Sequence, residues 1–204
     1  MTASLFDPKS TALVLADLQN DFLHPDGAYG RAGQTSLAIA ALPVRLGPVC
    51  QAVRRAGGWI VSTHLTLVPG RGGEPLISPH LKKLRPFLGK GDFMPGSFGH
   101  DLVDELKPAD FMIEKVAYSA FYMSRLEFVL RKAGIETLAF SGIVTGGGVA
   151  STLRDAHVRD FSTILLSDGC AAFDPKAHQM TVASLAAISA VMTCASFVEA
   201  LARS

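Results

Sequence analysis

Charged residues are scarce in this chain. Asp, Glu, Lys and Arg make up 18% of its 204 residues, whereas apolar residues make up 49%. An average soluble domain carries about a quarter charged residues. The formal net charge is only +1 and no basic cluster stands out, so nothing favours a nucleic-acid or membrane partner. Because so few charges leave apolar surface to cover, we expect a homo-oligomer, a dimer or larger.

Cysteines and long apolar runs are scarce as well. The three cysteines, Cys50, Cys170 and Cys194, are an odd number without metal-ligand spacing, which excludes a disulfide scaffold and a zinc motif. No leader with a basic and then an apolar part opens the chain, and no apolar run approaches the roughly 18 residues of a membrane span. The sequence therefore predicts a reduced, cytoplasmic protein.

Short apolar runs alternate with stretches of helical spacing. The runs cover residues 11–16, 59–63, 111–114, 137–143, 163–167 and 190–194. Continuous apolar runs are typical of parallel strands that are buried on both faces. With no linker or repeat, residues 1–204 are most simply one domain. The pattern predicts an α/β fold, a three-layer αβα sandwich around a parallel sheet.

The segments between these runs carry further local signals. Residues 36–56 show helical spacing that Pro43 and Pro48 should kink or interrupt. Ser124 and Glu127 form a possible capping box for a helix over 124–132, and Asp174 should cap a helix that starts near Pro175. Residues 65–100 hold seven glycines and five prolines. So long a loop is usually functional, or covers a neighbour.

A glycine-rich turn follows the apolar run 137–143. Gly146, Gly147 and Gly148 precede a stretch of helical spacing that opens at Val149, so the order is strand, tight turn, helix. Such junctions lie at the carboxyl edge of an α/β sheet, where ligands bind and where the helix N-terminus favours negative charge. Glycines there allow positive φ and a close approach of the backbone to a ligand. The alternative is that they only make the turn.

Two opposite charges lie at the ends of other predicted strands. Asp17 ends the first run and Lys115 follows the third. Because the carboxyl ends of parallel strands share one edge, we expect their side-chain tips within about 8 Å of each other, where each stabilises the charged form of the other. A functional site and a buried structural ion pair both fit this arrangement.

These residues lie in segments that resemble the isochorismatase-like hydrolases, a superfamily that includes nicotinamidases and N-carbamoylsarcosine amidases. The segments are 14–22 (VLADLQNDF), 114–121 (EKVAYSAF), 142–156 (GIVTGGGVASTLRDA) and 167–172 (SDGCAA). Their order and spacing cover nearly the whole chain. The resemblance implies a Rossmann-like, six-stranded parallel sheet, for which we expect the strand order 3-2-1-4-5-6. It also implies that the chain forms a homodimer or homotetramer.

The resemblance also implies site residues. In its amidase branch a cysteine nucleophile works with an aspartate base and a lysine, which would be Asp17 and Lys115, but Gly148 stands at the cysteine position. A cis peptide between Ile143 and Val144 is implied, with Thr145 and Gly147 completing a backbone cradle for an oxyanion.

The remaining expectations concern the pocket and its ligands. We expect Gln19, Phe22, His64, Tyr118 and Phe121 to line a pocket for a small-molecule substrate. The metal-binding amidases carry an Asp-x-His motif where this chain offers only His64, and a metal site needs three or four ligands. We therefore expect no metal and no cofactor.

Gly148 leaves three functions open. The resemblance to isochorismatases proper favours a hydrolase that cleaves a small anionic vinyl ether, with Asp17 as general acid. A second possibility is an amide or carbamoyl hydrolase that uses activated water or another nucleophile, such as Thr145, Ser151 or Cys170. The third is a binding protein that kept the fold without catalysis.

Overall fold

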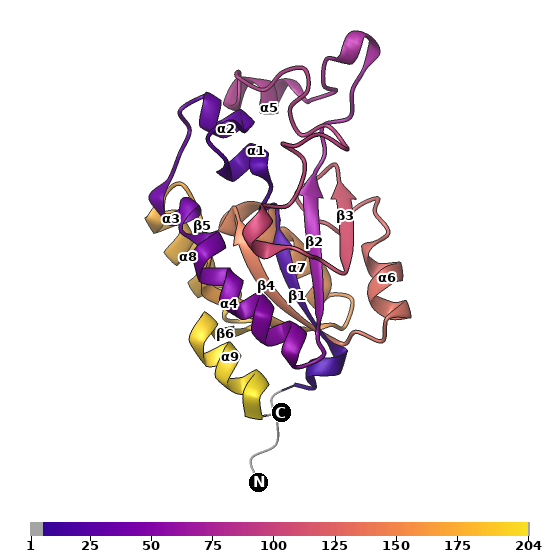
Figure 1. Cartoon of the computed structure of the whole chain (residues 1–204), viewed down its shortest axis with the longest axis vertical. Coiled ribbons are helices and arrows are strands. Elements are labelled where there is room, and N and C mark those ends of the chain that lie inside the picture. The colour runs from indigo at the N-terminus through magenta and orange to yellow at the C-terminus, as the bar shows by residue number, and fades with distance from the viewer. Residues whose placement is uncertain (1–5, 204) are drawn as a thin grey trace.

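A computed structural model describes residues 6–203. Its six parallel strands form one sheet in the order β3-β2-β1-β4-β5-β6, which confirms the predicted order (Figure 1). The strands are β1 Thr11–Ala16, β2 Trp59–Leu65, β3 Phe111–Lys115, β4 Thr137–Ile143, β5 Ser162–Ala171 and β6 Ala190–Met192.

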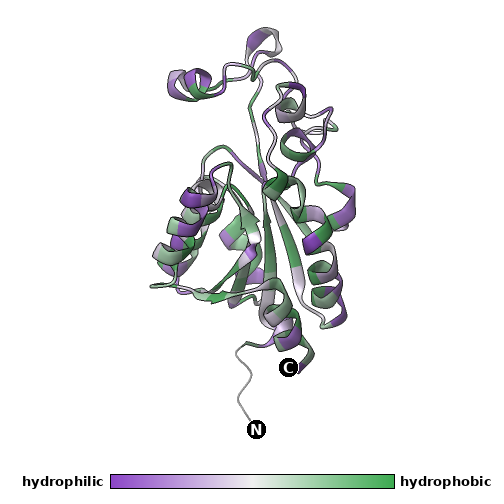
Figure 2. Ribbon diagram, turned by 90° about the vertical axis from the view of Figure 1, so that its left-hand side faces the viewer, coloured by the Kyte–Doolittle hydropathy of each residue, from purple (hydrophilic) through white to green (hydrophobic). Residues whose placement is uncertain are grey.

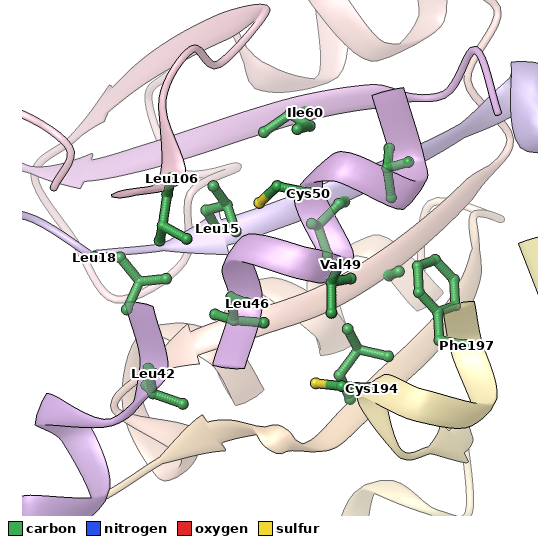
Figure 3. Close-up of a cluster of buried hydrophobic side chains, with 14 of the residues drawn as sticks. Leu15, Leu18, Leu42, Leu46, Val49, Cys50, Ile60, Leu106, Cys194 and Phe197 are labelled. Atoms are coloured by element: carbon green, nitrogen blue, oxygen red, sulfur yellow. The ribbon is translucent and has the colours of Figure 1, made fainter. Parts of the chain in front are cut away.

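Helices cover both faces of this sheet. On one face lie α4 (Leu42–Arg55) and α9 (Cys194–Arg203), and on the other α6 (Leu126–Lys132), α7 (Ala150–His157) and α8 (Pro175–Leu185). Successive side chains of a strand point to opposite faces. Leu13 and Leu15 of β1 accordingly join the core under α4 (Figure 3), while Val14 packs with the helices behind. This two-sided burial explains why the strands read as continuous apolar runs (Figure 2).

The stretch before β2 differs from the prediction. The helical structure is interrupted at Ala41, between α3 (Leu37–Ala40) and α4. Helix α4 then continues through Pro48. Together the two helices, Leu37–Arg55, have the length and composition of a membrane span. No long apolar run is seen in the sequence of this stretch, because Arg45 divides it. Its side chains Leu42, Leu46, Val49 and Val53 are buried against the sheet, as in the core helix of a globular protein.

Helix ends follow the predicted signals in part. Asp174 caps α8 by accepting a hydrogen bond of 2.8 Å from the Lys176 N–H, as expected. The capping box at α6 is wrong. The helix begins at Leu126, Ser124 accepts from the Leu126 N–H at 3.0 Å, and the carboxylate of Glu127 pairs with Arg159 at 3.0 Å.

The long segment 65–100 is ordered by packing above the carboxyl end of the sheet. It contains η2 (Arg71–Gly73) and α5 (Pro79–Leu84), and it lies beside α1 (Asn20–Leu23) and α2 (Ala28–Arg31). A separate apolar cluster joins them, made of Ala28, Tyr29, Leu67, Leu88 and Phe93. The short elements η1 (Pro8–Ser10), η3 (Asp104–Leu106) and η4 (Thr145–Val149) complete the chain.

Polar side chains directly after β1 tie this segment down. The Asp21 carboxylate is buried and accepts from the N–H groups of Ala28 at 2.9 Å and Phe93 at 2.6 Å. The Gln19 amide accepts from the Leu65 N–H at 2.8 Å and donates to the His100 carbonyl at 3.0 Å. These bonds satisfy backbone groups that a buried loop would otherwise leave unpaired.

Gly142 allows the ends of β1 and β4 to come close together. Its φ is +111°, and a Cβ placed on it would lie 2.2 Å from the Ala16 carbonyl oxygen. Any side chain at this position therefore meets both an unfavourable backbone conformation and a steric clash.

We predict that Gly142→Ala lowers the free energy of unfolding by about 2–5 kcal/mol, from the sum of left-handed strain and overpacking. Gly134→Ala is the matched control. Its φ is +69° but nothing lies within 4 Å of the added Cβ, so we expect a loss of only about 1–2 kcal/mol. Urea denaturation measures both variants. Equal decreases in the free energy of unfolding would show that the close approach of Gly142 to Ala16 does not contribute to the effect.

Candidate active site

The Asp17–Lys115 ion pair lies at the carboxyl edge of the sheet. Asp17 follows β1 with φ +57° and donates its N–H to the Thr63 carbonyl at 2.9 Å. Lys115 is the last residue of β3. Its Nζ lies 2.8 Å from Asp17 Oδ2 and donates to the Ala117 carbonyl at 3.1 Å, and both side chains are buried. The structure thus joins the ends of two strands that β2 separates.

Burial dominates the electrostatics of Asp17. It raises the pKa of this carboxyl, and the charge and hydrogen bond of Lys115 oppose the rise. Asp17 Oδ1 and Thr63 Oγ1 are buried and make no hydrogen bond of good geometry among residues 6–203, although Thr63 and Leu65 lie close enough to favour the carboxylate form of Asp17.

Gly148 faces this ion pair directly. A Cβ built on it would lie 2.9 Å from Asp17 Oδ2, 3.5 Å from Lys115 Nζ and 3.4 Å from the Ile143 carbonyl oxygen. The glycines of the turn do not use the positive φ that we expected of them, since Gly146, Gly147 and Gly148 all lie outside that region. Gly148 instead allows the Asp17 carboxylate to approach the backbone of the turn, since a Cβ at this position would be too close to Oδ2.

The backbone around the turn matches the expected cradle only in part. The Ile143–Val144 peptide is cis, as expected. However, the Gly147 N–H donates to the Val144 carbonyl at 2.8 Å, so it is not free for an oxyanion, and Ile143 turns a carbonyl acceptor toward Gly148. The buried Thr145 hydroxyl lies 2.8 Å from Nδ1 of His178 on α8, a partner that sequence reasoning missed.

One predicted pocket residue lies at the turn. A ring carbon of Tyr118 would be 3.4 Å from a Cβ on Gly147, and this tyrosine is 67% exposed. Phe22 packs instead against Tyr29 and Phe93, with ring centroids 4.8 and 4.6 Å apart. It packs against the apolar cluster that joins segment 65–100 to α1 and α2.

The other three predicted pocket residues have different contacts. His64 is fully buried, with Nδ1 2.7 Å from the His100 carbonyl and Nε2 2.9 Å from the Ser62 hydroxyl. Burial lowers its pKa to about 4. Thr63 lies beside Asp17, so the next residue, His64, points to the opposite face of the sheet. Gln19 holds segment 65–100, and Phe121 packs on Phe161 in the core behind the sheet, at 6.0 Å between centroids.

Cys170 is placed as a core residue. It is buried, its Sγ lies 3.7 Å from the Phe140 carbonyl oxygen, and burial raises the pKa of its thiol. A thiol held protonated is a poor nucleophile. Within residues 6–203 no three His, Cys, Asp or Glu side chains are grouped to hold a metal ion.

A cavity of about 360 Å³ lies at the carboxyl end of β5, between α3, α4 and α8. Its polar lining includes Arg45, Ser167, Asp168 and His178, and the buried Cys170 also borders it. Its lining does not include Asp17, Lys115 or Gly148. His178 is the link between this cavity and the glycine turn, through Thr145.

Comparison with known proteins agrees with this fold. Residues 11–196 match the model of the isochorismatase domain. The ureidoacrylate amidohydrolase RutB of Pantoea ananatis is 34% identical over 176 residues, which cover 80% of this chain and 70% of that protein.

Two solved structures are also similar. A cysteine hydrolase from Pseudomonas syringae pv. phaseolicola superposes with a TM-score of 0.82 at 23% identity, covering 100% of this chain and 99% of the other. N-carbamoylsarcosine amidase from Thermoplasma acidophilum gives a TM-score of 0.70 at 25% identity, covering 91% and 96%. The match of one domain model to most of the chain, with a relative at this identity, shows that the chain belongs to the isochorismatase-like hydrolase family.

Proposed function

We propose that this chain hydrolyses a C–N bond in a small amide or ureide, with water as the attacking nucleophile. The observation that carries the proposal is that a buried carboxylate and a buried ammonium lie against the turn at Gly148, a position without a side chain that could attack a substrate. The similar proteins named above as amidohydrolase and amidase support the substrate class. The burial of Cys170, which raises the pKa of its thiol, argues against a relocated thiol nucleophile.

In the proposed reaction, water binds next to the Asp17 carboxylate, on the side of the turn where Gly148 has no side chain. A Cβ on Gly148 would lie 2.9 Å from Asp17 Oδ2 and 3.5 Å from Lys115 Nζ, so both charged groups face the backbone of the turn. The Asp17 carboxylate accepts a proton from the water as its oxygen attacks the carbonyl carbon of the substrate. The Lys115 ammonium stabilises the negative charge that develops. Asp17 then returns the proton to the leaving nitrogen, the C–N bond breaks, and the acid and the amine are released.

A second candidate uses the same residues in the opposite protonation state. Because burial raises the pKa of Asp17, a protonated Asp17 could donate to the terminal carbon of a vinyl ether. Water then adds to the oxocarbenium ion, and the adduct collapses to a ketone and an alcohol. Lys115 opposes this candidate, since its charge favours the carboxylate form of Asp17.

Product analysis and an Asp17 variant test the choice. We expect wild type to release ammonia or an amine from a panel of ureides and amides, and Asp17→Asn to lower kcat by about 10²–10⁴-fold, as for loss of a general base. Cys170→Ala is the control and should keep its kcat, since the thiol is buried in the core. Pyruvate release from isochorismate would favour the vinyl-ether candidate. Loss of turnover in Cys170→Ala but not in Asp17→Asn would overturn both, and binding without turnover would indicate a non-catalytic protein.

The pH profile has opposite slopes for the two candidates. If the Asp17 carboxylate is the base, kcat/KM is constant above the pKa of Asp17, which burial raises, and falls about tenfold per pH unit below it. If Asp17 is the acid, kcat/KM falls as pH rises through the same pKa. Circular dichroism at each pH separates this effect from unfolding, because protonation of the buried His64 and His100 opposes folding at acid pH.

A methyl group at Gly148 should displace the Asp17 carboxylate, because its carbon would lie 2.9 Å from Oδ2. We predict that Gly148→Ala lowers kcat/KM by on the order of a hundredfold, the usual effect of displacing reacting groups by about 1 Å. Gly146→Ala is the control from the same turn, because its Cβ would contact the Thr181 hydroxyl at 3.2 Å instead of the ion pair. If Gly148→Ala keeps the activity of wild type, the contact of Asp17 with the turn is not needed for the reaction.

A further inference from the structure

Arg85 differs from the other arginines in the segments above the sheet. It caps the end of α5, its Nε donates to the Tyr29 hydroxyl at 3.0 Å, and its Nη1 donates to the Leu84 carbonyl at 2.9 Å. No carboxylate pairs with it among residues 6–203. Arg31, by contrast, is paired with Asp92 at 2.5 Å. The charge of Arg85 is therefore held in place but not neutralised by a carboxylate.

Tyr29 connects Arg85 to the carboxyl edge of the sheet. Its ring is stacked on that of Phe173, at 5.8 Å between centroids and 17° between planes. Phe173 follows β5 by two residues, and the last residue of β5, Ala171, pairs with Ile143 at the end of β4. Tyr29 thus lies near the strand end that leads into the glycine turn.

The electrostatics of Tyr29 indicate the same neighbourhood. Burial raises the pKa of its hydroxyl, Arg85 opposes the rise, and the charges of Tyr118 and Asp17 add to it. Tyr118 in turn packs against Gly147, next to Gly148. The hydroxyl that positions Arg85 is therefore close enough to Asp17 to respond to its charge.

We propose that Arg85 determines substrate specificity by binding a carboxylate group of the substrate at the carboxyl edge of the sheet, on the side of Asp17 and the glycine turn. The substrate class is then a small amide or ureide that carries a carboxylate, which rests on the proposed function. The ion pair of Asp17 and Lys115 is neutral overall, so Arg85 supplies positive charge that attracts an anion. Its Nη2 makes no hydrogen bond that ties it to the described chain, and a guanidinium matches the geometry of a carboxylate.

Tyr29 is the positioning residue in this proposal. It accepts the Nε hydrogen bond, and the guanidinium carbon of Arg85 lies 5.9 Å from the centre of its ring. Aromatic contacts hold the ring in turn, including Phe87 at 5.0 Å between centroids. Removing the hydroxyl should leave the charge of Arg85 in place but free its orientation.

Calorimetric titration tests the proposal, because it measures binding whether or not the ligand is turned over. The probes are N-carbamoylglycine, which carries a carboxylate, and N-carbamoylglycinamide, its neutral counterpart. Where wild type hydrolyses a probe, the titrations are made in the Asp17→Asn background. We expect Arg85→Gln to weaken binding of N-carbamoylglycine by about 10–100-fold, as for a lost charge-assisted hydrogen bond, and to change binding of the neutral probe less than about twofold.

Three further variants separate specificity from folding. Arg71→Gln removes a charge from exposed η2 and should change neither affinity. Arg85→Lys keeps the charge and should retain part of the preference for the carboxylate. Tyr29→Phe should weaken binding of N-carbamoylglycine alone, with a higher KM and unchanged kcat for any substrate found. It supplies the test if Arg85→Gln fails to fold.

The two probes also separate this proposal from the proposed function. Equal losses for both probes, or no loss for N-carbamoylglycine, would overturn the role of Arg85 even if amides are hydrolysed. Selective loss for the carboxylate probe without any hydrolysis would support the role of Arg85 and count against the amide hydrolase. Failure of wild type to bind N-carbamoylglycine more tightly than its neutral counterpart would overturn the carboxylate specificity.

Discussion

The buried contact between Asp17 and Lys115 is the constraint on which the carboxyl edge of this molecule depends. Two charges taken out of water lose hydration that their attraction only partly repays, and a single unpaired charge there would be far more costly. The pair therefore requires that β1 and β3 end at matching heights on either side of β2. Gly142 meets the same demand on the other side of β1, where no side chain fits against Ala16.

Much of the fold could be predicted because it rests on local patterns. Six apolar runs correspond to six strands, and Asp174 caps its helix as its sequence context indicates. The meeting of Asp17, Lys115 and Gly148 was also predictable, since parallel strands bring their carboxyl ends to one edge. The errors at α6 and α4 are of another kind. Ser124 and Pro48 have strong local preferences, but tertiary packing sets where each helix begins and how far it runs.

The pocket was harder to predict because a motif does not say which way a side chain points. His64 ends in the core because a strand residue one position from Thr63 belongs to the other face. The side-chain amide of Gln19 already forms hydrogen bonds with the backbone of segment 65–100, so it does not face a substrate. Tyr29 and Arg85 meet although they are 56 positions apart, in segments without periodicity. No local pattern indicates such a contact.

The position of Gly148 has a consequence for how this chain can evolve. Some glycine codons are one nucleotide change from a cysteine codon, so a thiol at this position can be within reach of a single mutation. The carboxylate of Asp17 stands only 2.9 Å from where the first carbon of that side chain would be. A cysteine side chain therefore fits here only if the ion pair moves. A variant in which Asp17 is displaced loses the base of the reaction before it gains a working nucleophile. Neighbouring substitutions that shift the pair have to come first, which makes the order of mutations decisive.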